Sequence, residues 1–425
     1  MTGNNNLKEM GQRAREAYHC MARATTEQKN LALKTLLKNL IESRETILEA
    51  NQRDFAIAKA AGTEEAMLDR LLLCGRLENV IDVTQSVIAL PDPIGKEIES
   101  RTLPNGLTLT KRRTPIGVLG VIYESRPNVT IDVAALTIKT GNCAILRGGS
   151  ETLNSNRALV SVIQNTLKQV GLPPDAIQFI DSADRSRVID LLRLQKYVDL
   201  IIPRGGAGLH EFCLEHSKIP VIIGGIGICH LFVDESANQE KALEVIDNAK
   251  TQRPAVCNAL DTLLVHKNVA NNFIPSVINK LGKEGVSFRL DPAAWQIFES
   301  QRDQLQAKCE HAKSEDWDRE WLSLILGIRV VNDLDEALEH IQTHSTGHSD
   351  GILTQDEGNA NHFVDEIDSS SVYVNASTRF TDGGQFGLGA EIAISTQKLH
   401  ARGPMGLEEL TSYKWIVKGD YHVRS

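Results

Sequence analysis

Hydrophobic residues along the first 90 positions recur with the spacing of amphipathic helices, so the segment from Lys8 to Leu90 is predicted to be mostly helical. Thr25 and Gln28 fit a capping box, in which side chains and backbone amides satisfy one another at the start of a helix. The apolar positions that follow share one face of that helix: Leu33, Leu36, Leu37, Leu40 and Ile41. We expect this stripe to pack into the core of the protein.

After Pro93 the pattern changes to short apolar runs separated by amphipathic stretches. The runs predict strands at Thr114–Tyr123, Cys143–Arg147, Ile177–Ile180, Val198–Pro203, Pro220–Ile223, Thr262–His266, Leu324–Val331 and Gly351–Thr354. The stretches predict helices at Val129–Lys139, Leu153–Val170, Arg185–Leu194, Val269–Leu281 and Leu334–Thr343. Strands with so little polar alternation are typical of parallel sheets covered by helices on both faces. The predicted fold class is therefore α/β, with two Rossmann-like parallel-sheet domains.

The two predicted sheets meet between Glu235 and Leu260. We place an N-terminal helical and cofactor-binding domain at residues 1–235, a catalytic domain at 236–375 and a C-terminal segment at 376–425. Within that last segment, Trp415–Val417 is short and apolar. It fits either a strand that pairs with another subunit or an internal edge strand. A small oligomerisation element and a homo-oligomer are expected.

Charge and composition exclude several classes of protein. The net charge of −9 over 425 residues argues against a nucleic-acid partner held by phosphate contacts. The one basic run, Lys111–Arg113, is predicted to be a solvated turn beside a strand. No apolar run approaches the roughly 18 residues of a membrane helix, and the N-terminus lacks an apolar core of signal-peptide length. Seven cysteines without a CxxC pair fit a reducing compartment, so a cytoplasmic protein is expected.

Three glycine-rich turns stand at the ends of predicted strands, at Arg147–Ser150, Arg204–Gly208 and Gly224–Gly227. Ligands of open parallel sheets bind at the carboxyl ends of strands, where glycine lets the backbone approach a phosphate closely. None of the turns has the GxGxxG spacing of the dinucleotide fingerprint. A single such turn is also common in ordinary strand-to-helix connections, but three in succession favour a phosphorylated cofactor.

Cys257 lies in a polar turn that contains a proline, just before the strand predicted from Thr262. A cysteine in such a turn between two α/β units is a candidate nucleophile, although a buried structural thiol is the more common fate of cysteine. The predicted strands around Cys143 and Cys229 favour a structural role for those two thiols. The histidine-rich segment from His340 to Asp350 has no further ligands at metal-binding spacing, so no metal is expected.

The order of these motifs resembles the aldehyde dehydrogenase superfamily over nearly the whole chain. The segments that carry this resemblance are the turn around Cys257, Glu320–Arg329, Asp333–Leu338, Gly384–Leu388 and Gly406–Tyr413. More narrowly, several segments resemble the gamma-glutamyl phosphate reductase family: residues 340–350, Gly117–Arg126, Asn375–Phe380 and Gly389–Ala393. The resemblance implies an aldehyde dehydrogenase-like fold and a cysteine nucleophile.

Two departures from the broader family bear on the chemistry. Aldehyde-oxidising members carry a glutamate that activates water two residues before the second glycine turn, and here that position is Ile222. An aliphatic side chain accepts no proton, so hydrolysis of an acyl-enzyme is not expected. NAD-preferring relatives often place a carboxylate three residues after a strand-end lysine. Here Arg147 replaces the lysine and Ser150 the acid, which favours NADPH although Glu151 follows directly.

The resemblance therefore implies an NADP-dependent oxidoreductase of proline biosynthesis. In it, Cys257 attacks L-glutamyl 5-phosphate, expels phosphate and leaves a thioester, and hydride from NADPH reduces that thioester to L-glutamate 5-semialdehyde. The expected cofactor-binding residues are Arg147, Ser150, Gly205, Gly206, Gly225 and Glu320. The expected substrate-binding residues are Ser125, Arg126, Ser377, Arg379 and His348. Two alternatives remain, an aldehyde-oxidising dehydrogenase and a non-catalytic oligomeric scaffold, and an upstream glutamate kinase is a further possible partner.

Overall fold

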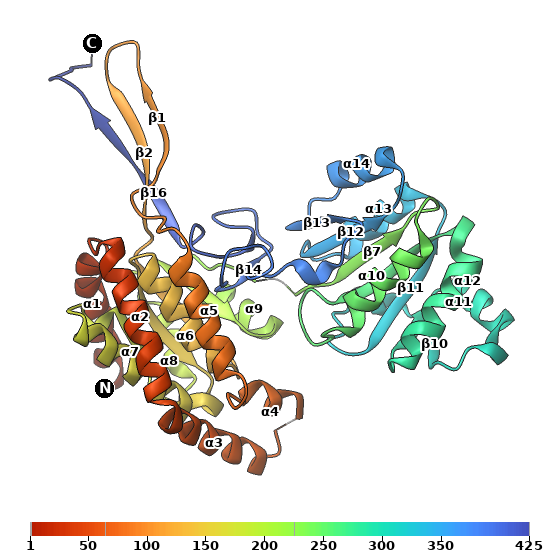
Figure 1. Ribbon diagram of the computed structural model, residues 1–425, viewed down its shortest axis with the longest axis horizontal. Coiled ribbons are helices and arrows are strands. Elements are labelled where there is room, and N and C mark those ends of the chain that lie inside the picture. Colours follow the sequence, from red (N-terminus) through yellow and green to blue (C-terminus); the bar gives the residue numbers. More distant parts are fainter. Residues whose placement is uncertain (1, 64, 225, 425) are drawn as a thin grey trace. The chain divides into compact units, whose positions relative to one another are not determined.

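The computed structural model describes residues 2–63, 65–224 and 226–424 and divides the chain into two compact units (Figure 1). The first unit comprises residues 1–224, 383–393 and 404–425, and the second comprises residues 225–382 and 394–403. The predicted C-terminal segment 376–425 is thus shared between the two units. Within the described residues, no helix is both long and apolar enough to cross a membrane.

The first unit is built on a parallel four-stranded sheet of order β5-β4-β3-β6. Its strands are β3 (Val118–Tyr123), β4 (Cys143–Gly148), β5 (Ile177–Phe179) and β6 (Leu200–Arg204). Its helices are α1 (Thr2–Met21), α2 (Thr26–Glu42), α3 (Arg44–Ala60), α4 (Glu65–Leu71), α5 (Leu77–Ala89), α6 (Asn128–Lys139), α7 (Leu153–Gln169), α8 (Ser186–Leu192) and α9 (Ala207–His216). Every residue of β3 and β4 is buried, as predicted for a sheet between two helical layers.

The N-terminal helices form as the sequence predicts. Thr25 caps α2 through a reciprocal capping box with Gln28. Along the predicted stripe, Leu33, Leu36 and Leu40 are fully buried, whereas Ile41 is 57% exposed. The stripe is therefore narrower than predicted, because its last position turns away from α5 and α7, the helices on which α2 packs.

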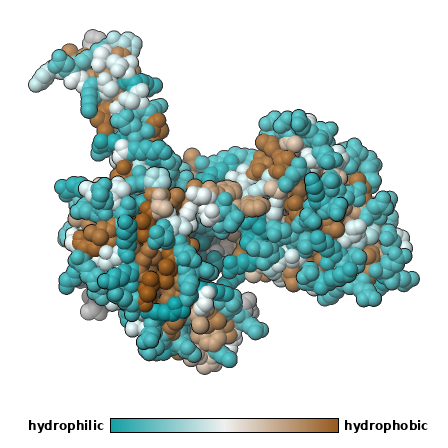
Figure 2. All heavy atoms as spheres, in the orientation of Figure 1, coloured by the Kyte–Doolittle hydropathy of each residue, from teal (hydrophilic) through white to brown (hydrophobic). Residues whose placement is uncertain are grey.

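An antiparallel arm extends from the first unit (Figure 1). It pairs β1 (Glu97–Thr102) with β2 (Thr108–Pro115), and β2 with β16 (Thr411–Lys418). The prediction of a turn at Lys111–Arg113 is wrong, because these residues lie inside β2 and Lys111 stacks over the Tyr413 ring at 3.9 Å. Figure 2 shows hydrophobic residues on this arm among hydrophilic ones. The exposed apolar and aromatic side chains of the arm are Ile98, Tyr413, Trp415 and Val417.

The second unit is built on a seven-stranded parallel sheet of order β10-β9-β11-β8-β7-β12-β13. Its strands are β7 (Cys229–Val233), β8 (Leu260–His266), β9 (Ser287–Leu290), β10 (Cys309–His311), β11 (Ile325–Val331), β12 (Ser349–Leu353) and β13 (Ser371–Val374). Its helices are α10 (Gln239–Thr251), α11 (Lys267–Lys283), α12 (Pro292–Ser300), α13 (Leu334–His344) and α14 (Glu357–Glu366). Two further short strands, β14 (Ile394–Ser395) and β15 (Gly403–Pro404), pair with each other.

Alternate residues of the central strands enter two separate cores of the second unit. Leu263 and Val265 of β8 pack with α10, α11 and α12, whereas Leu264 between them packs with α13 and α14. Because side chains alternate across a strand, a strand buried on both faces is apolar at most positions, and its polar side chains must find buried partners. This explains the continuous apolar runs in the sequence.

One predicted strand is absent from the structure. Residues 220–223 form only an isolated bridge between Val221 and Ile201. The segment makes hydrogen bonds to β6 through the Ile201 backbone on each side of that bridge, but it is too short and irregular to continue as a strand. The glycine turn at Gly224–Gly227 therefore precedes β7 instead of following a strand.

Candidate functional site

Cys257 lies in the second unit, in the loop between α10 and β8 at the amino end of the parallel sheet. Cys257 is partly exposed. Its backbone carbonyl accepts a hydrogen bond from the Cys229 Sγ at 3.3 Å, and Ala259 N donates to Val256 O at 3.0 Å across the turn. The loop is therefore fixed by its own backbone and by the first residue of β7.

The other cysteines are less suited to nucleophilic chemistry. Burial raises the thiol pKa of Cys143 and Cys229 well above its usual range, and it raises those of Cys213 and Cys309 to about 12. A thiol with so high a pKa is almost wholly protonated at neutral pH, and only the thiolate is nucleophilic. The two remaining cysteines, Cys20 and Cys74, are exposed in the first unit.

Asn258, next to the cysteine, ties the nucleophile loop to the segment around Arg379. Its side-chain amide donates to Thr381 O at 2.9 Å and to Arg379 O at 3.3 Å, while its Oδ1 accepts from the Arg379 guanidinium. The Arg379 Nε also donates to Gln252 Oε1 at 2.8 Å, at the start of the same loop. Burial lowers the pKa of Arg379, and the Cys257 sulfur is among the groups that act on it electrostatically. The structure thus brings Cys257 and Arg379 together.

Two other predicted substrate residues lie near this segment. Ser377 is buried and its Oγ accepts from Arg379 N at 3.3 Å, at the start of the short 3-10 helix Thr378–Phe380. His348 is fully buried beside β12, and its Nδ1 bonds Ser349 Oγ at 2.8 Å. Ser349 Oγ in turn bonds Thr381 Oγ1 at 2.6 Å, so this hydroxyl pair connects His348 to the Arg379 segment.

Glu320 stands before β11, on the same end of the sheet. Its Oε1 accepts a hydrogen bond from Gly227 N at 3.1 Å. The next residue, Trp321, donates its backbone N–H to Asp261 Oδ1 at 3.2 Å. Asp261 also forms a buried ion pair with Lys250 at 3.6 Å, and burial raises the pKa of its carboxyl to about 7. A buried pair therefore anchors the backbone that carries Glu320.

The histidine-rich segment from His340 to Asp350 is held in place by hydrogen bonds and an ion pair. Asp350 Oδ1 accepts from His230 N at 2.9 Å and contacts His230 Nδ1 at 3.0 Å, while Asp350 Oδ2 accepts from Ser345 Oγ at 2.6 Å. His344 pairs with Asp318 at 2.7 Å. Among the described residues there is no group of three or more histidine, cysteine or carboxylate side chains placed to hold a metal ion. These contacts join the 344–350 segment to β7.

His340 of α13 makes the second unit sensitive to acid. Burial, with the nearby His230 and Arg329, lowers its pKa to about 2. The unfolded chain binds a proton there below pH ~6.5 and the native chain does not, so stability falls as the pH falls below that value. This one residue is expected to cost about 2 kcal/mol between pH 7.5 and pH 5. Urea midpoints of the His340→Gln variant should depend less steeply on pH, and equal slopes would contradict this assignment.

In the first unit, the predicted cofactor residues lie at the carboxyl ends of β4 and β6, the two strands on either side of β3. Arg147 ends β4 almost fully buried, donates to Gly148 O at 2.7 Å, and has an Nε with no partner among the described residues. After β6, Gly206 N donates to Glu124 Oε2 at 3.1 Å. A Cβ on Gly205 would lie 2.7 Å from the carboxyl carbon of Glu124, so a side chain there would require the Glu124 carboxylate to move. The Glu124 carboxylate therefore accepts a hydrogen bond from the backbone amide of Gly206, the residue just before α9.

The turn after β4 contains Glu151, a second carboxylate that is occupied by hydrogen bonds within the protein. Glu151 Oε1 accepts from Ser125 N at 2.7 Å and from Ser125 Oγ at 2.8 Å. Ser125 is buried and has a positive φ of 43°. Ser150 is exposed and Arg126 is partly exposed on the same edge of the sheet. Gly225 lies outside the described residues. Ser125 and Arg126 therefore fall in the first unit, whereas the other predicted substrate residues fall in the second.

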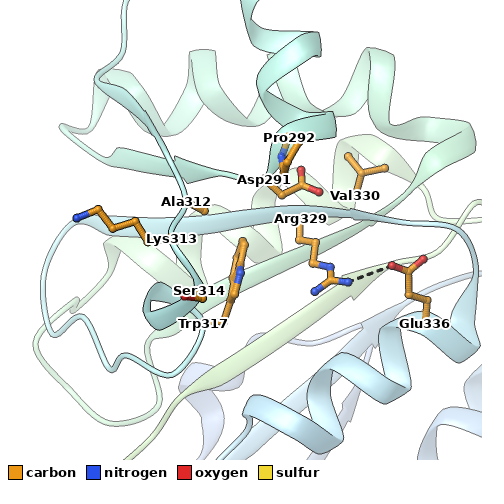
Figure 3. Close-up of a pocket in the computed structure, with 9 residues that line it drawn as sticks. All are labelled: Asp291, Pro292, Ala312, Lys313, Ser314, Trp317, Arg329, Val330 and Glu336. Atoms are coloured by element: carbon orange, nitrogen blue, oxygen red, sulfur yellow. Dashed lines mark hydrogen bonds and ion pairs between the residues drawn. The ribbon is translucent and has the colours of Figure 1, made fainter.

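A pocket of about 250 Å³ opens at the opposite, carboxyl end of the second sheet (Figure 3). Its lining residues are Asp291, Pro292, Ala312, Lys313, Ser314, Trp317, Arg329, Val330 and Glu336. Arg329 pairs with Glu336 at 3.2 Å, and Asp291 caps α12 through Ala294 N. None of the predicted site residues lines this pocket.

Sequence reasoning missed three residues that shape these sites. Asn258 directly follows Cys257, and this adjacency to the candidate nucleophile was the one signal in the sequence that could have identified it. Glu124 directly follows β3, beside two glycine turns. Gly227 belongs to the glycine turn that is predicted from the sequence to favour a phosphorylated cofactor, but its position beside Cys257 and Glu320 leaves no sign in the sequence, because those residues lie 30 and 93 positions away.

Comparison with known proteins defines the class. The aldehyde dehydrogenase family model matches residues 2–323 and 317–416. An engineered glycolyl-CoA reductase with bound NADP⁺ shares the fold, with a TM-score of 0.69 at 15% identity and 96% coverage of each chain. The chain belongs to the aldehyde dehydrogenase family, and its cofactor is a nicotinamide dinucleotide, NAD or NADP.

Closer relatives narrow the class to one enzyme. The gamma-glutamyl phosphate reductase of Escherichia coli O81 (strain ED1a) is 54% identical over 420 residues, which cover 99% of this chain and 100% of the relative. The crystal structure of gamma-glutamyl phosphate reductase from Thermotoga maritima has a TM-score of 0.94 at 48% identity, and the match covers 98% of this chain and 99% of the other. Within the family, the chain therefore groups with the gamma-glutamyl phosphate reductases.

Proposed function

We propose that the protein reduces L-glutamyl 5-phosphate to L-glutamate 5-semialdehyde with NADPH and releases phosphate, as the second step of proline biosynthesis from glutamate. The observation that carries this proposal is the partly exposed Cys257, which stands at the amino end of the second sheet with Arg379 and Glu320 tied to its neighbours. The full-length similarity to gamma-glutamyl phosphate reductases supports the choice of substrate.

In the proposed reaction, the Cys257 thiolate forms a bond to the γ-acyl carbon, and the bond from that carbon to the phosphate oxygen breaks. Phosphate leaves with the electron pair, so the product of this half-reaction is a thioester. The backbone N–H of Cys257 stabilises the oxyanion that forms on the acyl oxygen, which requires no particular side chain. NADPH supplies the hydride that reduces the thioester. The hemithioacetal alkoxide formed by hydride addition collapses to the aldehyde, and the Cys257 sulfur leaves with the electron pair as the thiolate that began the reaction.

Arg379 is proposed to bind an anionic group of the substrate. Its guanidinium is held from two sides by Asn258 and Gln252, both in the nucleophile loop. An arginine fixed in this way recognises a carboxylate or phosphate with little loss of side-chain freedom. Ser377 and His348 are proposed to help, through the Arg379 backbone and the Ser349–Thr381 hydroxyl pair respectively. Ser125 and Arg126 complete the proposed substrate set.

The choice of NADPH over NADH rests on the turn after β4. Arg147 provides a buried guanidinium, with one nitrogen that has no partner among the described residues, beside Ser150, where NAD-preferring relatives often have an acid. Glu151, the acid nearest to this turn, is turned onto Ser125 by two hydrogen bonds. A 2′-phosphate bound at this turn would lie near the arginine, while the nearest carboxylate of the turn is held on Ser125. Gly205, Gly206 and Gly225 are proposed to accompany the phosphates, and Glu320 to bind the nicotinamide ribose.

The proposed organisation keeps the domains of the sequence analysis, with cofactor residues mainly in 1–235, the nucleophile in 236–375, and the C-terminal strand in an oligomerisation arm. The exposed aromatic side chains of β16 support a homo-oligomer formed through this arm. All seven cysteines are free thiols, which supports a cytoplasmic location.

The experiment that tests this function runs the reaction in reverse. Oxidation of L-glutamate 5-semialdehyde by NADP⁺ should require inorganic phosphate or arsenate, because the chain offers Ile222, buried and aliphatic, where oxidising relatives have a base. Omitting the anion should reduce NADPH formation to the background rate, and chloride or sulfate at equal ionic strength should not restore it. Sustained NADPH formation without phosphate would identify an aldehyde-oxidising dehydrogenase instead.

A further inference from the structure

The residues just before and within β7 form a junction at the amino end of the second sheet. Gly227 N donates to Glu320 Oε1 at 3.1 Å, and Ile228 N donates to Thr346 Oγ1 at 3.0 Å. The Cys229 thiol donates to the Cys257 carbonyl at 3.3 Å. Three consecutive residues thus bond to three different segments, the Glu320 segment, the 345–350 segment and the nucleophile loop.

Gly227 is the residue of this junction that touches the nucleophile backbone. A Cβ at position 227 would overlap the Cys257 carbonyl oxygen and would lie 2.5 Å from the carbonyl carbon and 3.1 Å from its Cα. Non-bonded carbon atoms pack at about 3.5–4.0 Å, so a side chain at this position displaces the Cys257 backbone by at least roughly 1 Å. The atoms in the way are backbone atoms, which no rotamer change can remove.

The same glycine also contacts the carboxylate proposed to bind the nicotinamide ribose. Its N–H is directed at Glu320 Oε1 while its Cα faces the Cys257 carbonyl. One residue therefore fixes both the nucleophile backbone and the cofactor carboxylate. Any movement of its backbone changes the position of one group relative to the other.

We infer that Gly227 is a positioning residue that sets the spacing between the Cys257 loop and Glu320, and thereby between the thiolate and the nicotinamide. The inference rests on the proposed function, because it assumes that Cys257 and Glu320 act in one reaction. It adds a requirement that the chemistry alone does not impose: the residue two positions before β7 must have no side chain and must present its N–H to Glu320.

The test compares Gly227→Ala with Gly358→Ala. Gly358 lies on α14 of the same unit, where an added Cβ meets only the end of the Asp356 side chain at 3.0 Å. Gly227→Ala is expected to lower kcat about 100-fold, because a misplacement of about 1 Å at a reacting centre has an effect of that size. Gly358→Ala is expected to retain wild-type kcat. Both variants are compared with wild type by circular dichroism and urea midpoint, so that loss of folding is scored separately from loss of rate.

A double-mutant cycle separates positioning from a general structural defect. Glu320→Gln and Gly227→Ala are combined, and kcat/KM for NADP⁺ is measured for all four proteins. If Gly227 acts through Glu320, the double variant loses less than the product of the single losses, since contacting residues are not additive. Multiplicative losses would overturn the inference.

A second pair of variants applies if Gly227→Ala does not fold. Glu320→Gln keeps an acceptor for the Gly227 amide and Glu320→Ala does not. The rate of Cys257 alkylation by iodoacetamide without nucleotide should stay near wild type with Gln and change about tenfold with Ala, the effect of losing a hydrogen bond to a charged group. Equal rates in the two variants would overturn the inference. A folded, fully active Gly227→Ala enzyme would do so too, while leaving the phosphate requirement, and hence the proposed function, intact.

Discussion

Replacing Cys257 by alanine is expected to abolish reduction of L-glutamyl 5-phosphate. Without the sulfur no thioester forms, and the chain offers no second thiol of ordinary reactivity in the second unit, since burial raises the pKa of Cys229 and Cys309. Removal of a covalent nucleophile costs on the order of 10⁴-fold or more in kcat in other enzymes. The rate of NADPH formation from L-glutamate 5-semialdehyde and phosphate measures the loss.

The same variant should still bind its cofactor. Arg147 bonds Gly148, Gly206 bonds Glu124 and Glu320 bonds Gly227, and the substitution removes none of these groups. The dissociation constant for NADPH should therefore stay within about threefold of wild type, a difference below 1 kcal/mol. Cys74→Ala is the matched control, because Cys74 is an exposed thiol in the first unit. Appreciable turnover by Cys257→Ala would exclude the covalent route.

Replacing Lys29 by methionine is expected to destabilise the first unit by roughly 3–5 kcal/mol. The Lys29 Nζ lies 2.9 Å from Asp92 Oδ2, and the two side chains are only 2% and 6% exposed. Methionine preserves the apolar stem but leaves the Asp92 carboxylate buried without its cation. The hydroxyl of Thr26 and the amide of Ile94 still donate to that carboxylate, but neither carries charge. The urea midpoint followed by far-ultraviolet circular dichroism measures the effect.

Lys38→Met provides the comparison on the neighbouring turns of the same helix. Lys38 pairs with Glu42 at 3.7 Å, with side chains 71% and 60% exposed, so solvent screens the interaction. Its loss should change the free energy of unfolding by no more than about 0.5 kcal/mol. Similar midpoints for the two variants would show that the buried pair contributes no more than the exposed one. Restoring stability in a Lys29→Met/Asp92→Asn double variant would confirm that the uncompensated charge causes the loss.

Most of the secondary structure followed from local pattern. The predicted helix Val129–Lys139 is α6 (Asn128–Lys139), and the predicted strand Thr262–His266 is β8 (Leu260–His266). Such elements are predictable because the period of apolar residues matches the period of the buried face. The predicted strand at residues 220–223 does not form, because apolar composition alone does not provide strand pairing. Their apolar composition resembles that of a buried strand, but their backbone forms only a single bridge, between Val221 and Ile201.

The arm was mispredicted at Lys111–Arg113 because charged residues are uncommon in buried strands. These positions lie in β2, whose side chains are mostly half-buried, and the strand is stabilised by β1, β16 and stacking of Lys111 on Tyr413. The partner strand β16 lies some 300 residues away, so no local pattern reveals the pairing.

The sequence by itself determined the α/β class, the helical N-terminus and the family, and it gave Cys257 as the candidate nucleophile, because these depend on residue type, on periodicity and on motifs contiguous in the chain. The tertiary structure decided the surroundings of the site. It placed Asn258 against Arg379, turned Glu151 onto Ser125, and set the Gly227 backbone between Cys257 and Glu320. These contacts join residues 26 to 121 positions apart, and short-range packing and hydrogen bonding between such residues exist only after the chain has folded.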